Sequence, residues 1–496
     1  MRKRPDIGVG QLVLQISFPE GLDNDTAGET ECPINEPAVS GAPPAARSKP
    51  ERKGKWYSLY DKVYALPNLL KAWERVQDNR GAPGIDGTTV EKFAEDAEGR
   101  LRALSLDLRE KTYRPQPVRR VLIPKSGGGK RPLGIPTVRD RIVQQSLLQV
   151  MEPIFEAKFS DRSHGFRPDR GCATALDVVD RAVKAGYGWV VDADIKAFFD
   201  TVNHDKLVDF VAEEISDGSV LKLIRQILTA GVVMPETAEA EPTEEGTPQG
   251  GPLSALLANI YLHSFDVRMK EAGYGVVRYA DDFVAFARSE DEATQGLQRV
   301  REIIEGELGL TLHPEKTRVV SVDAGFAFLG FHYFRDPETG RLLKEVREKS
   351  VRRFREAIRQ KTPRLRAQRR FKACHATFKR LVKNQRLRDM IKDVSRHLRG
   401  WHWYFKTAWL QYKPPFNTFD GFTRRRIRLA ITGRVGNGWW NALITNEMLG
   451  ALGLVSLVDL QHKYLSGQLA PPVRKDGLGG EPYAGNPHVR FGREGG

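Results

Sequence analysis

The sequence predicts an α+β fold, in which strands and helices alternate between about residues 110 and 335, followed by an all-helical region. Two observations favour this class. Short β-prone runs bounded by Gly and Pro alternate with longer runs of helical periodicity up to residue 335. From residue 349 to about 460, apolar residues recur at helical spacing, with aromatic residues interleaved and many Lys and Arg residues at the other positions.

The first helices are expected between Trp56 and Leu108, where apolar residues recur every three or four positions. A turn-rich loop at 80–87 divides this stretch. Residues 118–136 contain two β-prone pieces around a basic, glycine-rich tip, which predicts a β-hairpin. After it, the periodicity predicts a helix over residues 140–155.

The remaining elements follow from the same periodicities. Apolar β-prone runs predict a strand at 189–195, a hairpin at 276–286 and a strand pair at 326–334. Helical spacing predicts helices over 205–228, 252–270 and 290–308.

The two ends of the chain differ in composition from the rest. Residues 1–52 and those after Gly467 are rich in Gly and Pro and show no sustained period, so they bury too little apolar surface to offset the entropy of ordering. We expect a disordered extension over 1–55, a folded unit over 56–340, a helical unit over 345–460 and a flexible tail over 461–496.

The positive charge is concentrated in one segment. The chain carries a formal net charge of +15, yet residues 345–434 alone contain 27 Lys and Arg against 6 Asp and Glu. A solvated helical face seldom has such an excess over so long a stretch, which points to a polyanionic partner.

Cysteine usage and hydropathy indicate the compartment. Cys32, Cys172 and Cys374 are far apart and form no CxxC pair, so a reducing compartment is expected rather than a disulfide framework. No apolar run reaches about 18 residues, so no membrane span is expected. The basic start followed by Pro5 is a poor secretory signal. We expect a cytoplasmic protein.

Three carboxylates stand out as a candidate metal site. Asp281 and Asp282 are adjacent between two β-prone runs, where they repel each other unless something positive binds. Asp194 ends the apolar strand at 189–195, and alternation puts Asp192 on the same face as a supporting acid. Carboxylates on neighbouring strands suit Mg²⁺. An ordinary turn is the alternative, because a lone Tyr-x-Asp-Asp arises by chance in about one of twenty chains of this length.

Several motifs occur together and in a definite order. They are Ile123-Pro-Lys with Arg131-Pro-Leu-Gly-Ile-Pro-Thr, His164-Gly-Phe-Arg-Pro, Asp194-Ile-Lys-Ala-Phe-Phe, Thr247-Pro-Gln-Gly-Gly-Pro-Leu-Ser, Leu257-Ala-Asn-Ile-Tyr-Leu, Tyr279-Ala-Asp-Asp, Leu310-Thr-Leu-His-Pro-Glu-Lys-Thr and Phe328-Leu-Gly-Phe. With these motifs, the stretch from about Trp56 to Leu460 resembles the reverse transcriptase/maturases encoded by bacterial group II introns. The resemblance implies a right-hand polymerase fold of fingers and palm, followed by a helical thumb or maturase (X) domain.

The resemblance assigns metal ligands and a nucleotide gate. Asp194, Asp281 and Asp282, with the Ile195 carbonyl as a further ligand, would hold two Mg²⁺ ions, with Mn²⁺ as a substitute. Phe199 occupies the position of the steric gate, where a ring under the sugar leaves no room for a 2′ hydroxyl. Without the motif, a core aromatic would be the better interpretation of Phe199.

Other positions would contact the substrates. Lys125 and Arg131 would grip the dNTP triphosphate, and Gln249 would lie beside the incoming nucleotide; a solvated loop and a helix-entry turn are the alternatives. Lys316 is a candidate proton donor to pyrophosphate, although a surface lysine explains it equally well. His164 and Arg167 of the His164-Gly-Phe-Arg-Pro motif, and Arg170 just after it, would line the template path. A purely structural loop is the alternative.

The basic helices would bind nucleic acid through phosphates, without reading sequence. The arginines singled out for this role are Arg352, Arg353, Arg424, Arg425 and Arg426. The family implies that this region grips an RNA template with its DNA primer and binds the intron RNA, and that the protein acts on target DNA. Many relatives continue into an HNH endonuclease with Cys pairs; none follow Arg434, so we expect a form without that domain.

Three functions remain open from the sequence. The first is an RNA-directed DNA polymerase of a mobile group II intron that also assists splicing and supports retrohoming. The second is a maturase that only binds RNA and assists splicing, and the third is a domesticated or defence-associated relative. The retention of Asp194, Asp281, Asp282 and Phe199 favours the first, because a pure splicing factor could lose them.

Overall fold

A computed structural model of the chain describes residues 54–124, 130–234, 240–247, 250–365, 383–408, 415–432 and 444–469. The expected N-terminal extension lies outside these residues up to position 53, as does the expected tail from position 470. None of the helices in the described part combines the length and apolar character that a bilayer crossing requires.

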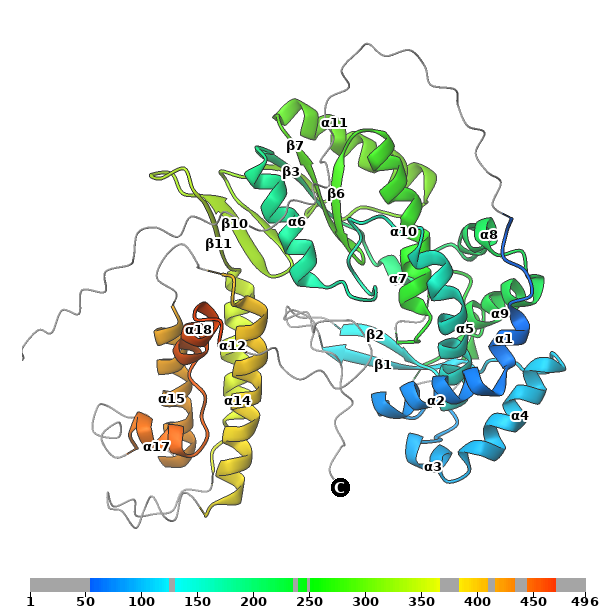
Figure 1. The fold of residues 1–496 in the computed structure, drawn as a ribbon, viewed down its shortest axis with the longest axis horizontal. Coiled ribbons are helices and arrows are strands. Elements are labelled where there is room, and N and C mark those ends of the chain that lie inside the picture. Colours follow the sequence, from blue (N-terminus) through cyan, green and yellow to red (C-terminus); the bar gives the residue numbers. More distant parts are fainter. Residues whose placement is uncertain are drawn as a thin grey trace, which may run out of the picture. The chain divides into compact units, whose positions relative to one another are not determined.

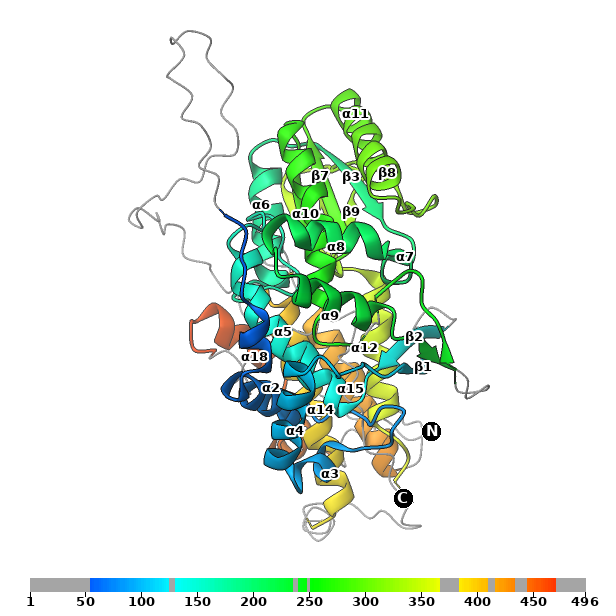
Figure 2. The same ribbon diagram turned by 90° about the vertical axis from the view of Figure 1, so that its right-hand side faces the viewer.

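The N-terminal helices pack around a long buried helix. These elements are α1 (Tyr60–Tyr64), α2 (Leu66–Asn79), α3 (Val90–Ala94), α4 (Ala97–Arg109) and α5 (Val138–Glu156). Helix α2 lies along α5 (Figure 2). The Thr137 hydroxyl caps α5 by accepting from the Asp140 amide at 3.1 Å. The helical stretch expected at 88–108 is divided in two, because Asp96 caps α4 through the Gly99 amide.

The expected hairpin at 118–136 is confirmed. It consists of β1 (Val118–Pro124) and β2 (Lys130–Ile135), which pair antiparallel. Two short strands, β4 (Val232–Val233) and β5 (Ala240–Glu241), extend the sheet in the order β2-β1-β4-β5. The sequence did not indicate these two strands. The neighbouring helices are α7 (Phe198–Thr201), α8 (His204–Glu214) and α9 (Gly218–Leu228). Asp217 separates α8 from α9 by accepting from the amides of Ser219 and Val220.

A four-stranded antiparallel sheet follows, in the order β6-β7-β3-β8. Its strands are β3 (Trp189–Asp194), β6 (Gly275–Tyr279), β7 (Asp282–Ala287) and β8 (Arg318–Ser321). On one face, Val191, Ala193 and Phe283 share a core with α10 (Ser254–Glu271) and α11 (Glu290–Arg301). Helix α11 continues as a π-helix at Glu302–Glu307. Figure 1 shows α10 and α11 beside this sheet. On the other face, Val190 and Val284 pack with α6 (Cys172–Lys184), which the periodicity had not indicated.

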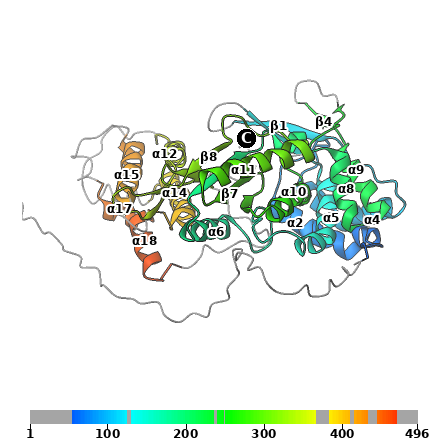
Figure 3. The same cartoon turned by 90° about the horizontal axis from the view of Figure 1, so that it is seen from above.

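This second core continues into a three-stranded sheet and the basic helices. The sheet consists of β9 (Phe326–Phe328), β10 (Phe331–Arg335) and β11 (Leu342–Val346). The helices are α12 (Glu348–Lys361), α14 (Gln385–Phe405), α15 (Phe416–Thr432), α17 (Asn446–Ala451) and α18 (Leu457–Leu465). Figure 3 shows these helices as one group. The Tyr404 hydroxyl donates to the Leu329 carbonyl at 2.8 Å, which ties α14 to the turn between β9 and β10. Helix α18 extends past residue 461, where the tail was expected to begin.

The described residues therefore form a mixed α and β structure, in agreement with the class that the two periodicities predict.

Candidate active site

Two of the three predicted carboxylates are partners across neighbouring strands. Asp194 at the end of β3 is aligned with Asp282 at the start of β7. Directly opposed residues on antiparallel strands lie on the same face with Cβ atoms about 5 Å apart. Tyr279 is paired with Asp282 across the hairpin, so that Ala280 and Asp281 form its two-residue turn. The register thus brings Asp281 next to this pair, although the chain separates it from Asp194 by more than eighty positions.

The electrostatics of this group show a shortage of positive charge. Burial raises the pKa of the Asp282 carboxyl well above its usual range, and the nearby carboxylates of Asp281, Asp192 and Asp194 raise it further. Burial also raises the pKa of Asp192, although Arg318, whose Nε lies 3.6 Å from Asp192, acts in the opposite direction. Four half-buried acids that raise one another's proton affinity favour the binding of a cation.

Lys316 supplies one positive charge here. Its Nζ lies 2.5 Å from Asp194 Oδ2. The His313 amide donates to the Asp194 carbonyl at 2.7 Å, and the turn that follows brings Lys316 alongside the carboxylate. The adjoining Ile195 forms a bridge with Leu312, and its side chain is buried.

The donor set fits a divalent cation in chemistry. Carboxylate oxygens are the ligands that Mg²⁺ prefers, and the raised pKa of Asp282 reflects the repulsion that a cation would relieve. Within the ranges given above, however, no three Asp, Glu, His or Cys side chains are grouped as a metal site. The strands align Asp194 with Asp282, while the Asp194 carboxylate is turned to Lys316.

The turn that carries Asp281 has an unusual backbone. Ala280 has φ +58°, and it is buried. A positive φ at the first of two turn residues is where hairpins usually have glycine, so Ala280 needs support from its surroundings. A Cβ added to Gly165 would lie 2.3 Å from the Ala280 nitrogen, so the 162–165 segment passes directly against the turn and only glycine fits there.

Arg278, on β6 next to this turn, supports the turn from inside the fold, a role that was not predicted from the sequence. Its side chain is fully buried, and its guanidinium donates to both oxygens of Asp266, to the side chain of Asn259 and to the Ala280 carbonyl. The signal was present, because a charged residue in the apolar run at 276–279 requires a buried partner.

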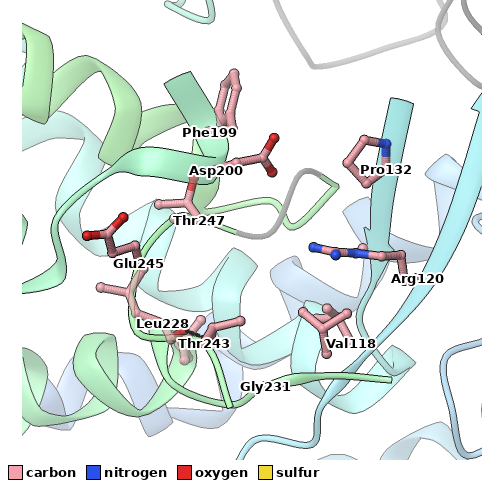
Figure 4. Close-up of a pocket in the computed structure, with 14 residues that line it drawn as sticks. Val118, Arg120, Pro132, Phe199, Asp200, Leu228, Gly231, Thr243, Glu245 and Thr247 are labelled. Carbon is pink, nitrogen blue, oxygen red and sulfur yellow. Dashed lines mark hydrogen bonds between the residues drawn. The ribbon is translucent and has the colours of Figure 1, made fainter. Parts of the chain in front are cut away.

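Phe199 lines a pocket near the β1–β2 hairpin (Figure 4). Its ring is buried and meets Phe198 edge-on at 5.2 Å between centroids. The pocket is also lined by Asp200, Arg120 and Thr247, whose amide donates to the Phe199 carbonyl at 2.7 Å. Residues from the hairpin, from α7 and from the 243–247 segment therefore meet around one hollow.

Three predicted nucleotide contacts have no described side chain. Lys125 and Gln249 lie outside the described residues, and Arg131 is described only through its backbone, in β2, opposite Ile123.

The template contacts expected in the His164 loop need correction. The Arg167 side chain is only 3% exposed, and its guanidinium donates to both oxygens of Glu156 and to two backbone carbonyls, so it holds the loop together from inside. His164 is buried as well, with Nδ1 at 2.8 Å from the Thr174 hydroxyl. Neither side chain is available to a template, because both face the interior. Arg170 is partly exposed and is paired with Asp161.

The five arginines singled out on the basic helices differ in exposure. Arg352 and Arg425 are exposed, and Arg352 is paired with Glu348 one turn earlier. Arg353, Arg424 and Arg426 are half-buried. Arg426 donates to the Thr362 hydroxyl at 3.3 Å, and so links α15 to the end of α12.

Comparison with known proteins identifies the family. Residues 123–333 match the family described as "Reverse transcriptase (RNA-dependent DNA polymerase)". Protein YkfC of Escherichia coli (strain K12) is 34% identical over 308 residues, which cover 54% of this chain and 80% of YkfC. The group II intron-encoded protein LtrA of Lactococcus lactis subsp. cremoris is 42% identical over 198 residues, 39% of this chain and 32% of LtrA. Nuclear intron maturase 2, mitochondrial, of Arabidopsis thaliana is 29% identical over 218 residues, 36% of this chain and 29% of that protein.

The matched region contains all three predicted carboxylates and the residues of the Ala280 turn. The alignments reach most of the length of YkfC but only about a third of LtrA and of the plant maturase. The chain is a reverse transcriptase, an RNA-directed DNA polymerase, and belongs to the family of group II intron-encoded reverse transcriptases and maturases.

Proposed function

We propose that this chain copies an RNA template into DNA by adding dNTPs to a DNA primer at Asp194, Asp281 and Asp282. The observation that carries the proposal is the alignment of Asp194 with Asp282 on adjacent strands, with Asp281 in the adjoining turn. Their mutual repulsion, expressed in the raised pKa of Asp282, supports a role in holding cations.

Reverse transcriptases use divalent metal ions, and in this chain the proposed ligands are Asp194, Asp281 and Asp282, with the Ile195 carbonyl in addition. Two Mg²⁺ ions bound there, or Mn²⁺ in their place, would supply the positive charge needed to activate a 3′ hydroxyl and to stabilise pyrophosphate. The protein's own contribution is to hold the carboxylates in place on the strands, where Asp282 is half-buried at the start of β7.

The remaining roles concern the nucleotide. Phe199 would exclude the 2′ hydroxyl of ribonucleotides, a role supported by its place beside a pocket. Lys125, Arg131 and Gln249 would bind the dNTP. Lys316 would donate a proton to the departing pyrophosphate, and its position next to Asp194 supports this assignment.

The wider proposal concerns architecture and partners. Residues 56–340 would act as fingers and palm, and residues 345–460 as the thumb or maturase domain. The exposed arginines Arg352 and Arg425 would engage the phosphates of a template–primer duplex and of the group II intron RNA. The complex with that RNA would assist splicing and support insertion into target DNA. The cation excess of this segment, together with the intron-encoded relatives, supports the proposal.

The test separates DNA synthesis from RNA binding. Asp281→Ala with Asp282→Ala is expected to abolish cDNA synthesis from a primed RNA with Mg²⁺ and dNTPs, while splicing of the cognate intron RNA continues. Asp336→Ala, an acid in the turn between β10 and β11 and outside the β6-β7-β3-β8 sheet, serves as the control and should retain both activities. Full cDNA synthesis by the double variant would refute the proposed site, and loss of splicing in a folded variant would refute the separation of roles.

A further inference from the structure

The turn that carries Asp281 is held by a buried hydrogen-bond network. Arg278 and Asp266 form an ion pair with side-chain exposures of 0% and 4%. Arg278 Nε donates to Asp266 Oδ1 at 2.8 Å and Nη2 donates to Oδ2 at 2.6 Å, so the fork of the guanidinium is fixed by both carboxylate oxygens. This fixed orientation aims the remaining nitrogen, Nη1, at the turn.

Nη1 connects the ion pair to the turn itself. It donates to the Ala280 carbonyl at 2.9 Å and to Asn259 Oδ1 at 3.0 Å. Ala280 is the residue with positive φ, and its carbonyl belongs to the peptide bond that leads into Asp281. A hydrogen bond from a buried, charged donor to that carbonyl holds this peptide in one orientation, and thereby the start of Asp281.

Asn259 links Arg278 to the segment on the opposite side of the turn. Its Nδ2 donates to the Gly165 carbonyl at 2.8 Å, while its Oδ1 accepts from Arg278. Gly165 is the residue that passes directly against the Ala280 nitrogen. The backbone of Arg278 is bound to the same segment, because it donates to the Arg162 carbonyl and accepts from the His164 amide. The turn is thus clamped between Arg278 and the 162–165 segment, with Asn259 joining the two.

We infer that Arg278 is a positioning residue, which through the Ala280 carbonyl fixes Asp281 for cation binding, with Asp266 and Asn259 orienting it. This inference rests on the proposed function, since it assumes that Asp281 is a metal ligand. A merely structural ion pair would need only Arg278 and Asp266. The extra bonds to Ala280 and Asn259 are what a positioning role requires.

The test removes the bond to Ala280 while keeping the core filled. Arg278→Met combined with Asp266→Leu replaces the pair by apolar side chains of similar size, an exchange that is often tolerated when both charges leave together. The matched control is Lys344→Met with Asp180→Leu, because that pair is also largely buried, with 2.7 Å between Lys344 Nζ and Asp180 Oδ2, and lies between β11 and α6.

Two measurements are made on the full chain. Mn²⁺ binding is monitored through the electron paramagnetic resonance signal of the free ion. The dissociation constant should rise by about 10–100-fold in the Arg278/Asp266 variant. The turnover number for dNTP addition should fall by a similar factor, while the KM for dNTP is unchanged, because the nucleotide contacts lie elsewhere. The Lys344/Asp180 variant should match the unaltered protein in both measurements.

The inference is overturned if the folded Arg278/Asp266 variant binds Mn²⁺ and turns over like the unaltered protein, or if the control pair loses both to the same extent. If the double variant does not fold, Arg278→Lys is used, since one ammonium keeps the charge near Asp266 but cannot serve all four acceptors, and the same losses are required of it. A separate variant, Asp281→Asn, tests the proposed function itself. If Asp281 is not a metal ligand, this variant binds Mn²⁺ as tightly as the unaltered protein does.

Discussion

Lys316 forms an ion pair with Asp194, with 2.5 Å between Nζ and Oδ2, at the end of the strand that carries the first predicted metal ligand. The Lys316 side chain remains 58% exposed, so the pair adds little to stability. The proposed function gives this pair a role, in which the ammonium group donates a proton to pyrophosphate.

We expect Lys316→Ala to lower the rate of dNTP addition by about 10²-fold or more, which is the usual contribution of a positioned general acid. The unfolding midpoint should remain within about 1 °C, because an exposed ion pair contributes less than about 1 kcal/mol. Single-turnover incorporation on a primed RNA measures the rate. An unchanged rate would show that Lys316 is only a surface residue.

Phe199 is expected to set the choice between deoxy- and ribonucleotides. Phe199→Val shortens the side chain at the pocket, so the ratio of kcat/KM for dNTP over rNTP should fall by about 10–200-fold, the range for loss of one steric contact. Phe198→Val is the matched control, because Phe198 is 1% exposed and packs in the core. That variant should be less stable but should keep the ratio. A ratio unaffected by Phe199→Val would contradict the gate.

The sequence could predict which residues share a face, but not which residues face each other. Alternation along β3 puts Asp192 and Asp194 on one side, and both do influence the pKa of Asp282. The register that aligns Asp194 with Asp282 could not be predicted, because an alternating pattern alone does not select among registers that differ by two residues.

The roles of two buried arginines, Arg167 and Arg278, could not be predicted from the sequence either. Arg167 was assigned to the template path through its motif, with a structural loop as the alternative, and the structure favours the alternative, because Arg167 is bonded to Glu156 inside the fold. Arg278 was not singled out, although it stands in an apolar strand, because its partner Asp266 lies on a helix twelve positions earlier. Ion pairs between elements depend on tertiary packing, which local periodicity does not contain.

The close contact at Gly165 predicts a strong effect from a single methyl group. In Gly165→Ala the new Cβ would meet the Ala280 backbone nitrogen, which cannot move without shifting the turn. We expect the free energy of unfolding to fall by about 1–3 kcal/mol, as in overpacked cores, and cDNA synthesis to fall with it. Gly400→Ala is the control, since Gly400 lies within α14 and a Cβ there meets nothing within 4 Å. It should stabilise the chain by about 1 kcal/mol. Equal behaviour of the two variants would contradict the close approach.

The buried His164 predicts a loss of stability in acid. Burial, with the guanidinium groups of Arg170 and Arg167 nearby, lowers the pKa of His164 from 6.5 to about 4. Between these values the unfolded chain binds the proton and the folded chain does not. The contribution of neutral His164 to the free energy of unfolding is therefore complete above pH 6.5 and is lost as the pH falls to about 4. It amounts to about 3 kcal/mol.

His164→Gln should therefore reduce the dependence of stability on pH in this window, while it lowers stability at pH 7 through loss of the bond to Thr174. Denaturant unfolding at several pH values between 4 and 7 measures the slope. Parallel curves for the two proteins would show that His164 does not titrate as its surroundings indicate.

The exposed arginine Arg425 on α15 should contribute to RNA binding through charge alone. Each phosphate contact releases counterions, so Arg425→Ala should reduce the slope of log K against log salt by about 0.7–0.9 and weaken binding to all RNA sequences alike. Arg102→Ala is the control, because Arg102 is similarly exposed on α4, where it pairs with Glu98, and belongs to none of the basic helices. Filter binding of an RNA–DNA duplex over a range of salt concentrations measures both slopes. If Arg102→Ala changes the slope as much as Arg425→Ala does, RNA binding reflects the net charge of the whole chain, and the basic helices are not its site.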